Sequence, residues 1–461
     1  MSTSEQKPPR PRKNARDQNG SARRSASRLP ARSEGNAAGT QNAQSSAGWA
    51  QRLFKAVGPG VITGAADDDP SGIATYSVAG AQFGTSLLWT ALLSWPLMAA
   101  VQMMCARIGM VSGRGLAGNL KQKFPRWLLF AAVLALLVAN IFNIAADLAG
   151  MADAAQMLSG VHARWFVVIF AVLISWATVR LRYRHIADAL KWLVLVLFAY
   201  PITAFVVGPN WHLVVRATFL PSLPHGRAAW STLVALLGTT ISPYLFFWQT
   251  GQEIEEEKYE GKTTLASRRG ATEDELKLRT LDVGMGGFFS NLVSFFIILT
   301  TAVTLHRHGI TNIETTRQAA EALRPLAGRF AATLFTVGIV GVGFLAIPTL
   351  AGSAAYACAE TLGWNEGLDR SLRKARAFYA IILFSTAAGV GINFLGIDPV
   401  KALYWTAVLN GLVAPFLLVG ILMVATDKKL MVGQPSSRLA VVVVAVTTAA
   451  MFVAGVAMFV V

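Results

Sequence analysis

The feature that most constrains this chain is a series of apolar runs, each about 20 residues long, which recurs from about residue 57 to the last residue. An α-helix needs a run of about this length to cross the hydrocarbon core of a bilayer. The chain has 461 residues, of which 54% are hydrophobic and only 14% are charged. A soluble protein of this length would carry more charge on its surface. The pattern predicts an all-α membrane protein.

We expect a single transmembrane domain over residues 49–461, preceded by a tail. The tail, residues 1–48, is basic and has almost no large apolar side chain before Trp49. Such a segment cannot bury enough surface to offset its ordering entropy, so we expect it to be disordered. About eleven membrane-spanning helices are expected, at residues 57–80, 86–106, 127–150, 165–180, 187–207, 231–250, 283–305, 331–357, 377–396, 400–425 and 439–461.

The net charge of +16 would suggest a nucleic-acid partner in a soluble protein. Here most Lys and Arg residues lie in the tail or in short loops between the apolar runs. Basic loops of membrane proteins face the cytoplasm and its anionic lipid. We therefore expect the lipid bilayer as a partner and no nucleic acid. The loops after the second, fourth, eighth and tenth runs are basic, which predicts an inner (plasma) membrane protein with a cytoplasmic N-terminus.

Two of the apolar runs are interrupted near their centres. The first carries the sequence Asp-Asp-Asp-Pro-Ser-Gly at residues 67–72, and the sixth carries Gly-Thr-Thr at 238–240 and Ser-Pro at 242–243. Pro and Gly weaken a helix, and unwound backbone is tolerated in a membrane only where it is buried in protein or lines a polar cavity. A matched pair of broken helices is typical of transporters built from inverted repeats. The repeats would be about 57–207 and 231–425, with 439–461 as an extra helix.

The aspartates of the first broken helix are the candidate binding site. A carboxylate at mid-membrane depth costs at least a few kcal/mol, so such residues usually have a function. Asp67, Asp68 and Asp69, with nearby hydroxyls and freed carbonyls, would form an anionic site of oxygen ligands. Oxygen ligands suit a hard divalent cation such as Mg²⁺ or Mn²⁺. Which of the three aspartates face the cavity is left open by their spacing.

Further polar residues stand inside apolar runs. Asp147 in the third span is a candidate for the ion path or for a supporting carboxylate beside the site. Asn291 in the seventh span and Asn410 in the tenth are weaker candidates for the same path. The alternative for all three is an interhelical hydrogen bond, which is a common role of polar groups in membrane helices.

The chain resembles the Nramp family of divalent metal transporters, which has the leucine-transporter fold. The resemblance is carried by Gly-Pro-Gly at 58–60, by Asp-Pro-Ser-Gly at 69–72, and by the stretches AGAQFGTSLLW (79–89) and QMMCARIGMVSGRGLAG (102–118). It covers most of residues 55–430. It implies a 5+5 inverted repeat and metal ligation by Asp69, with Asp67 and Asp68 as outer partners of the ion.

The other family ligands fall on changed residues in this chain. Gly72 stands at the motif's Asn, and Ser242 stands where the sixth span of the family has a ligating Met. Thr239 takes the place that offers a backbone carbonyl, and Tyr244 takes the place of a His. Losing a thioether ligand weakens selection against Mg²⁺. The candidate metal site therefore comprises Asp69, Asp68, Asp67, Gly72, Thr239 and Ser242, with Tyr244 in the ion path or the outer shell.

The proton route that the resemblance implies is also incomplete. Asp147 matches the first of two acidic residues in the third span of the family, but Gly150 stands in place of the second. These departures resemble the Nramp-related magnesium transporters. They predict transport of Mg²⁺ and Mn²⁺ by alternating access without tight proton coupling, and no cofactor.

Several alternatives remain open. The chain could be a proton-coupled symporter for Mn²⁺ and Fe²⁺, a transporter of the same fold for an organic solute and sodium, or a channel. From a different class, an intramembrane aspartyl protease would need two facing aspartates that share a proton. The ATP-binding loop GxxxxGK[ST] is missing from the sequence, which argues against an ATP-driven pump. We expect no enzymatic activity.

Overall fold

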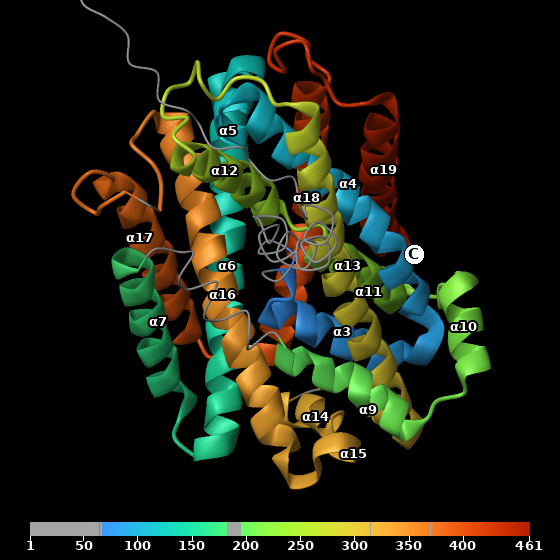
Figure 1. The fold of residues 1–461 in the computed structure, drawn as a ribbon. Helices are drawn as coiled ribbons and strands as arrows, with labels where there is room; N and C mark the ends of the chain where they lie inside the picture. The colour runs from blue at the N-terminus through green and yellow to red at the C-terminus, as the bar shows by residue number, and fades with distance from the viewer. Residues whose placement is uncertain (1–63, 65–66, 182–194, 314, 369) are drawn as a thin grey trace, which may run out of the picture. The chain divides into compact units, whose positions relative to one another are not determined.

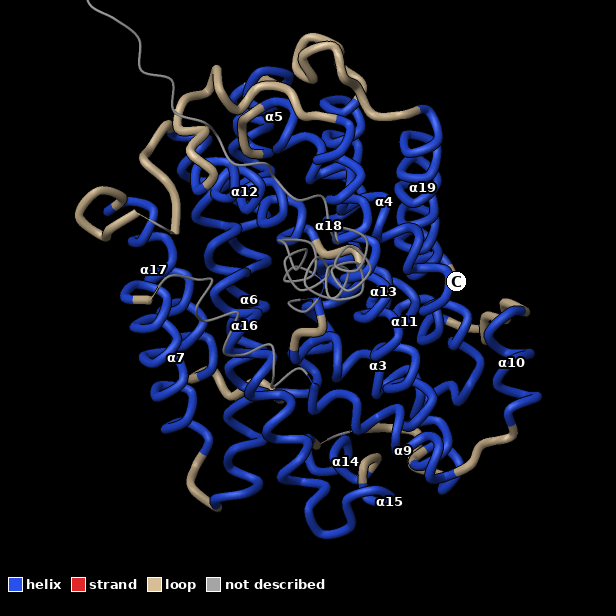
Figure 2. The backbone as a smooth tube through the Cα atoms, viewed as in Figure 1, coloured by secondary structure: helices blue, strands red, loops and turns tan. Residues whose placement is uncertain are grey.

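A computed structural model describes residue 64 and residues 67–181, 195–313, 315–368 and 370–461. These residues form helices joined by loops and contain no strand (Figure 2). The predicted tail, the start of the first predicted span and the start of the fifth lie outside the described residues.

The helices follow one another along the chain as shown in Figure 1. They are α3 (Pro70–Phe83), η1 (Gly84–Leu87), α4 (Leu88–Ser112), α5 (Leu116–Lys123), α6 (Arg126–Ser159), α7 (Ala163–Arg180), η2 (Leu195–Phe198), α9 (Ala199–Val207), α10 (Trp211–Phe219), α11 (Arg227–Thr240), α12 (Pro243–Tyr259), α13 (Glu273–Thr304), η3 (His306–His308), α14 (Thr316–Glu321), α15 (Arg324–Ala327), η4 (Gly328–Phe330), α16 (Ala331–Leu362), α17 (Arg376–Asn393), α18 (Pro399–Ala425) and α19 (Arg438–Val460).

Nine stretches of the described chain are long and apolar enough to cross a membrane, and a shorter apolar helix covers Val196–Val207. The eleven spans expected from the sequence all contain described helix. The two numbers differ because α3 and α4 form one continuous stretch, and because the fifth span is described only in its second part. The prediction of an all-helical membrane domain is confirmed.

Both predicted interruptions are present, and each is followed by a helix that begins at a proline. Asp68 and Asp69 are non-helical, and α3 starts at Pro70. In the sixth span α11 ends at Thr240, and α12 starts at Pro243. Proline suits the first position of a helix because its missing N–H has no partner there in any case.

The ends of these broken helices are closed by side chains. The Asp69 carboxylate accepts a hydrogen bond from the Gly72 backbone N–H at 2.7 Å, which caps α3. The Ser242 hydroxyl lies 2.8 Å from the Gly238 and Thr239 carbonyl oxygens at the end of α11. The freed backbone groups therefore have polar partners inside the protein, as burial requires.

Glycines allow the helices around the first break to approach closely. A Cβ atom at Gly238 of α11 would lie 2.7 Å from the Gly411 Cα atom of α18, closer than such atoms can approach. In the same way, Gly80 of α3 faces Ile298 and Thr301 of α13. Small residues at such crossings are typical of membrane helices. They bring α11 against α18 and α3 against α13.

Two helices extend further than expected from the apolar runs. α12 continues to Tyr259, beyond the expected end of the span at residue 250, so Glu253 and Glu255–Glu257 lie on its last turns. α13 begins at Glu273, ten residues before the apolar run starts. Its start is fixed by a capping box in which the Thr272 and Glu275 side chains bond to each other's backbone N–H groups.

Candidate metal site

Asp69 occupies the non-helical segment before α3 and divides its two oxygens between two roles. Its Oδ1 atom accepts hydrogen bonds from the Ser71 hydroxyl at 2.6 Å and the Gly72 N–H at 2.7 Å. Its Oδ2 atom faces the Tyr244 hydroxyl of α12 at 3.5 Å, which is long for an O–H···O bond. Oδ1 is thus committed to the helix cap, and Oδ2 is the oxygen left to meet a cation.

Asp67 and Asp68 are tied to α13 by a single residue, Ser290. The Ser290 Oγ atom lies 2.8 Å from Asp67 Oδ2 and 3.1 Å from Asp68 Oδ1. A hydroxyl has one proton, so it can donate to only one of the two carboxylates at a time. The other oxygen of Asp67 is buried and has no hydrogen-bond partner among the described residues.

Asp147 of α6 completes a group of four buried carboxyls. It is fully buried, and it lies close enough to Asp69 for their charges to interact. Neither of its oxygens accepts a hydrogen bond from the described chain. The prediction that Asp147 lies on the ion path or supports the site stays a prediction, and its burial beside Asp69 is compatible with it.

Thr239 and Gly72 face each other across the site. A Cβ atom at Gly72 would lie 3.1 Å from the Thr239 hydroxyl oxygen and 3.4 Å from Asp69 Oδ1. Any side chain at position 72 would therefore enter the space between these two groups. The Thr239 hydroxyl is buried and has no hydrogen-bond partner among the described residues, so its oxygen is available to a cation.

Ser242 is placed differently from a simple hydroxyl ligand. Its hydroxyl proton is used by the carbonyls of α11, including that of Thr239. A carbonyl oxygen has two lone pairs, so the Thr239 carbonyl can still accept a second partner. Ser242 thus holds the expected carbonyl ligand in place, while its own lone pairs remain free.

The two asparagines lie in interhelical hydrogen bonds. Asn291 of α13 accepts a bond from the Ser94 hydroxyl of α4 at 2.6 Å. The side-chain amides of Asn410 in α18 and Asn143 in α6 form two reciprocal hydrogen bonds, at 3.0 and 3.1 Å. These bonds join helices, and neither asparagine has a hydrogen bond to the aspartates among the described residues, while their predicted place on the ion path stays a prediction.

The described carboxyls are close together but do not form a finished metal site. No three His, Cys, Asp or Glu side chains of the described chain are arranged to hold one metal ion. Within the same residues, no Lys or Arg forms an ion pair with Asp67, Asp68, Asp69 or Asp147. Buried carboxylates without a counter-charge are costly, so this group favours a cation from outside the protein.

Ser290 was not identified from the sequence, although it contacts two of the three predicted aspartates. The only signal was a hydroxyl inside an apolar run. The sequence pointed instead to its neighbour Asn291, whose side chain is directed to a different helix.

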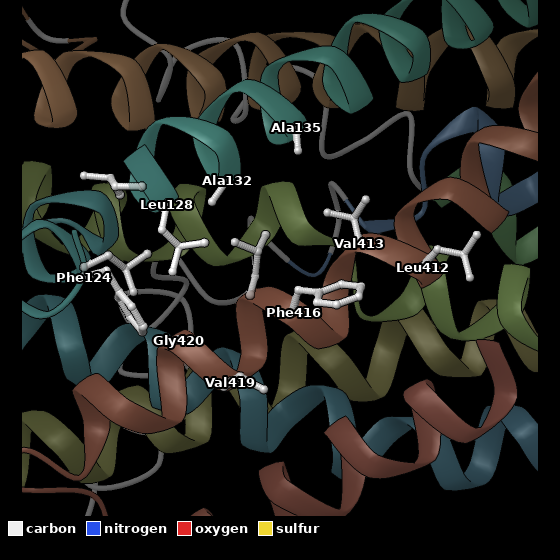
Figure 3. Close-up of a pocket in the computed structure, with 12 residues that line it drawn as sticks. Phe124, Leu128, Ala132, Ala135, Leu412, Val413, Phe416, Val419 and Gly420 are labelled. Carbon is white, nitrogen blue, oxygen red and sulfur yellow. The ribbon is translucent and has the colours of Figure 1, made fainter. Parts of the chain in front are cut away.

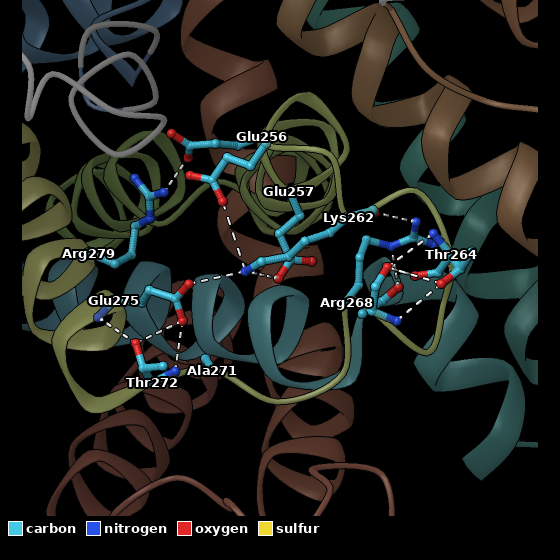
Figure 4. Close-up of polar contacts among 12 residues, drawn as sticks. Glu256, Glu257, Lys262, Thr264, Arg268, Ala271, Thr272, Glu275 and Arg279 are labelled. Carbon is cyan, nitrogen blue, oxygen red and sulfur yellow. Dashed lines mark hydrogen bonds and ion pairs between the residues drawn. The ribbon is translucent and has the colours of Figure 1, made fainter. Parts of the chain in front are cut away.

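A second polar cluster, the Arg279 cluster, joins the ends of α12 and α13 and was also not predicted. The Arg279 guanidinium of α13 lies 2.9 Å from Glu253 Oε1 and 2.6 Å from Asp282 Oδ2, and it also pairs with Glu256. Beside it, the Lys262 ammonium lies 3.1 Å from Glu275 Oε1 (Figure 4). The acidic side chains outnumber these two cations, and the cluster holds the two helix ends together.

Comparison with known proteins gives a consistent family. Residues 60–461 match the family described as Nramp, natural resistance-associated macrophage protein-like. The divalent metal cation transporter MntH of Caldanaerobacter subterraneus subsp. tengcongensis is 25% identical over 399 residues, covering 83% of this chain and 87% of the relative. The protein of the same name from Deinococcus radiodurans is 27% identical over 387 residues, covering 83% and 84%.

Solved structures share the fold. The manganese transporter of Eremococcus coleocola superposes with a TM-score of 0.68 at 19% identity, covering 88% of this chain and 86% of that one. Mhp1, a nucleobase-cation-symport-1 family transporter, superposes with a TM-score of 0.54 at 14% identity, covering 87% and 90%. The two relatives are named for divalent metal cations and the Eremococcus coleocola protein for manganese, so these names give no support to the expected magnesium branch.

Proposed function

Because the chain belongs to the Nramp family of divalent metal cation transporters, we propose that it carries Mn²⁺ across the plasma membrane by alternating access through a site built on Asp69. The chain is an integral membrane transporter and not an enzyme, which removes the protease alternative. Mn²⁺ is the ion in the name of the Eremococcus coleocola protein, whose fold this chain shares.

The single observation that carries the proposal is the group of four buried carboxyls without a basic partner in the described chain. Each fully desolvated carboxylate is destabilising by several kcal/mol unless a positive charge lies beside it. A divalent cation supplies that charge. The site therefore favours a doubly charged substrate over a neutral solute.

The proposed ligands come from both broken helices. Asp69 Oδ2 supplies the charge, the Thr239 hydroxyl lies across Gly72 from the Asp69 carboxylate, and the Thr239 carbonyl at the end of α11 is the second oxygen we assign to the ion. Asp67 and Asp68, held by Ser290, add negative potential without needing to touch the ion. Since three acidic groups do not converge on one point, we infer that water completes the coordination shell.

Asp147 supports proton coupling, whereas Gly150, which has no acidic side chain, argues against it. Asp147 lies beside Asp69 and makes no hydrogen bond of normal geometry within the described chain, so it could exchange a proton as the ion arrives. The second acidic position of the family route is Gly150, and a Cβ atom there would lie 2.9 Å from a Leu403 methyl carbon. A proton leaving Asp147 would need a different path.

A second candidate function is transport of Mg²⁺ without proton coupling. It is favoured by the oxygen-only ligand set, in which Ser242 replaces a thioether, because Mg²⁺ prefers oxygen ligands and keeps several of its waters. The name of the Eremococcus coleocola protein, a manganese transporter, favours Mn²⁺ instead. The two candidates differ in both ion and coupling.

The test is uptake by the purified protein in proteoliposomes that contain a metal-sensitive dye or a pH-sensitive dye. We expect Mn²⁺ uptake that saturates with concentration and that is lost in Asp69→Ala at concentrations that saturate the wild type. Mg²⁺ uptake at comparable rates, with an unchanged internal pH, would instead establish the second candidate. Uptake that does not saturate would point to a channel, and transport of neither ion would refute both proposals.

A further inference from the structure

An apolar groove lies between α6 and α18, on the side of both helices that carries α5. It is a hollow of about 580 Å³ lined only by apolar residues and glycine. Leu128, Ala132 and Ala135 of α6 form one wall, and Val413 and Phe416 of α18 form the other (Figure 3). Phe416 is 68% exposed, so the groove opens outward rather than into the core.

The depth and length of the groove fit its surroundings in a membrane. The lining residues run from 128 to 135 on α6 and from 412 to 420 on α18, which is roughly 10–12 Å at 1.5 Å per residue. α6 begins at Arg126 and α18 ends at Ala425. The groove therefore begins near one membrane face and extends through most of one leaflet.

The small side chains in the walls create the hollow. Ala132, Ala135 and Gly420 leave room where larger residues would fill the space between the helices. Nothing in the walls can form a hydrogen bond through its side chain, so water gains nothing by entering. An acyl chain is the occupant whose chemistry matches these walls.

The end of the groove at the membrane face is basic. Phe124 and Leu128 line this end, and Arg126 stands between them in the sequence. Arg126 is exposed and forms no ion pair within the described chain, and the same is true of Lys428, just beyond the end of α18. Lys123, in contrast, is paired with Asp427 at 2.6 Å. Two cations thus remain free for a headgroup.

An interfacial aromatic residue marks the same level. Trp127 follows Arg126 and is 72% exposed. Tryptophan is enriched where the hydrocarbon meets the headgroups, and basic loops face the cytoplasmic leaflet with its anionic lipids. The basic end, the position in the membrane and the apolar walls of the groove all fit an anionic phospholipid.

We propose that the groove between α6 and α18 is a binding site for one anionic phospholipid of the cytoplasmic leaflet. One acyl chain lies against Ala132 and Phe416, and the phosphate group meets Arg126 and Lys428. This site is separate from the aspartates, so the proposal does not depend on which ion is transported.

The test is native mass spectrometry of the full-length protein in mild detergent, titrated with phosphatidylglycerol or phosphatidylcholine of identical chains. We expect phosphatidylglycerol to bind several-fold more tightly. Arg126→Gln should weaken that preference by about five-fold, the effect of one basic residue near an anionic surface. Arg180→Gln, an exposed basic residue at the end of α7, is the matched control and should change nothing.

A second pair of variants tests the groove itself. Ala132→Phe fills it and should abolish binding of both lipids, whereas Ala131→Phe, on the exposed neighbouring position outside the groove, should leave binding unchanged. Equal affinity for the two lipids, or unchanged binding by both Arg126→Gln and Ala132→Phe, would overturn the proposal. Thermal unfolding of each variant shows whether it is folded.

Discussion

The two roles of Asp69 can be separated by one substitution, Asp69→Asn. The Asn carbonyl oxygen can keep both hydrogen bonds of Oδ1, to the Ser71 hydroxyl and to the Gly72 N–H. Asn and Asp are about equally good as helix caps. The change therefore preserves the start of α3 and alters only the second oxygen, which becomes an NH₂ group directed toward Tyr244.

The expected loss of metal affinity follows from the charge removed. Two unit charges 4 Å apart interact by about 4 kcal/mol at an effective dielectric constant of 20, so a divalent ion would lose about twice that. If desolvation offsets about two-thirds of this, about 2–3 kcal/mol remains, which is roughly 30- to 150-fold in affinity. Asp69→Ala should lose as much affinity and should also lose about 1 kcal/mol of stability with the cap.

The assay is Mn²⁺ uptake into proteoliposomes over a range of concentrations, with thermal unfolding of the same samples. Asp398→Asn is the matched control, because Asp398 caps α18 before Pro399 in the same way but lies outside the site. It should leave uptake unchanged. If Asp69→Asn took up Mn²⁺ with wild-type KM and rate, the assignment of Oδ2 as the ligand oxygen would be wrong.

Three further predictions concern stability, each measured by thermal or denaturant unfolding of the purified protein. Arg279→Gln leaves three acidic side chains without their common partner and should lower the free energy of unfolding by about 3 kcal/mol. Lys277→Gln, in an exposed pair at 4.0 Å, should lower it by less than about 0.5 kcal/mol. Equal effects of the two variants would show that the Arg279 cluster does not stabilise the contact between α12 and α13. Gly238→Ala should destabilise the protein by at least about 2 kcal/mol, because the added Cβ atom would overlap α18. At Gly284 an added Cβ atom meets no atom within 4 Å, so Gly284→Ala should be neutral or stabilising by up to about 1 kcal/mol. Glu366 lies in the loop after α16, where burial raises the pKa of its carboxyl to about 7 against the opposing effect of Lys258. The folded state holds this proton more tightly than the unfolded one, so the stability that Glu366 contributes is fully present below pH ~4.5 and is lost as the pH rises through 7. Glu366→Gln should therefore stabilise the protein at pH 8.5, by as much as about 3 kcal/mol, but not at pH 4.5. Stabilisation at pH 4.5 and none at pH 8.5 would contradict the burial of this carboxyl.

Features of the fold that depend on neighbours along the chain can be read from the sequence. Both helix breaks were predicted because proline and an adjacent polar cap act within three residues. The spans were predicted because their length is set by the bilayer. The missed start of α13 was also local, since the Thr272–Glu275 capping box is visible in the sequence, but it lies outside the apolar run that was used to place the helix.

Contacts between helices could not be predicted in the same way. Ser290 and Asn291 are neighbours, and both are polar residues in an apolar run. Successive residues of a helix point about 100° apart, so one of them faces the aspartates and the other faces α4. Which one does so depends on the rotation of α13 about its axis, and that is set by packing at Gly80, Ile298 and Thr301. The Arg279 cluster depends on the same rotation.

α13 is one unbroken helix from Glu273 to Thr304, and this has a mechanical consequence. Ser290, which binds Asp67 and Asp68, and Arg279, which binds the end of α12, are eleven residues apart on it, or about 16 Å. A helix of this length acts as a stiff rod, so any tilt of α13 that moves Ser290 also displaces Arg279. The ion pairs at the end of α12 and the aspartates held by Ser290 are therefore linked through the rigidity of a single helix.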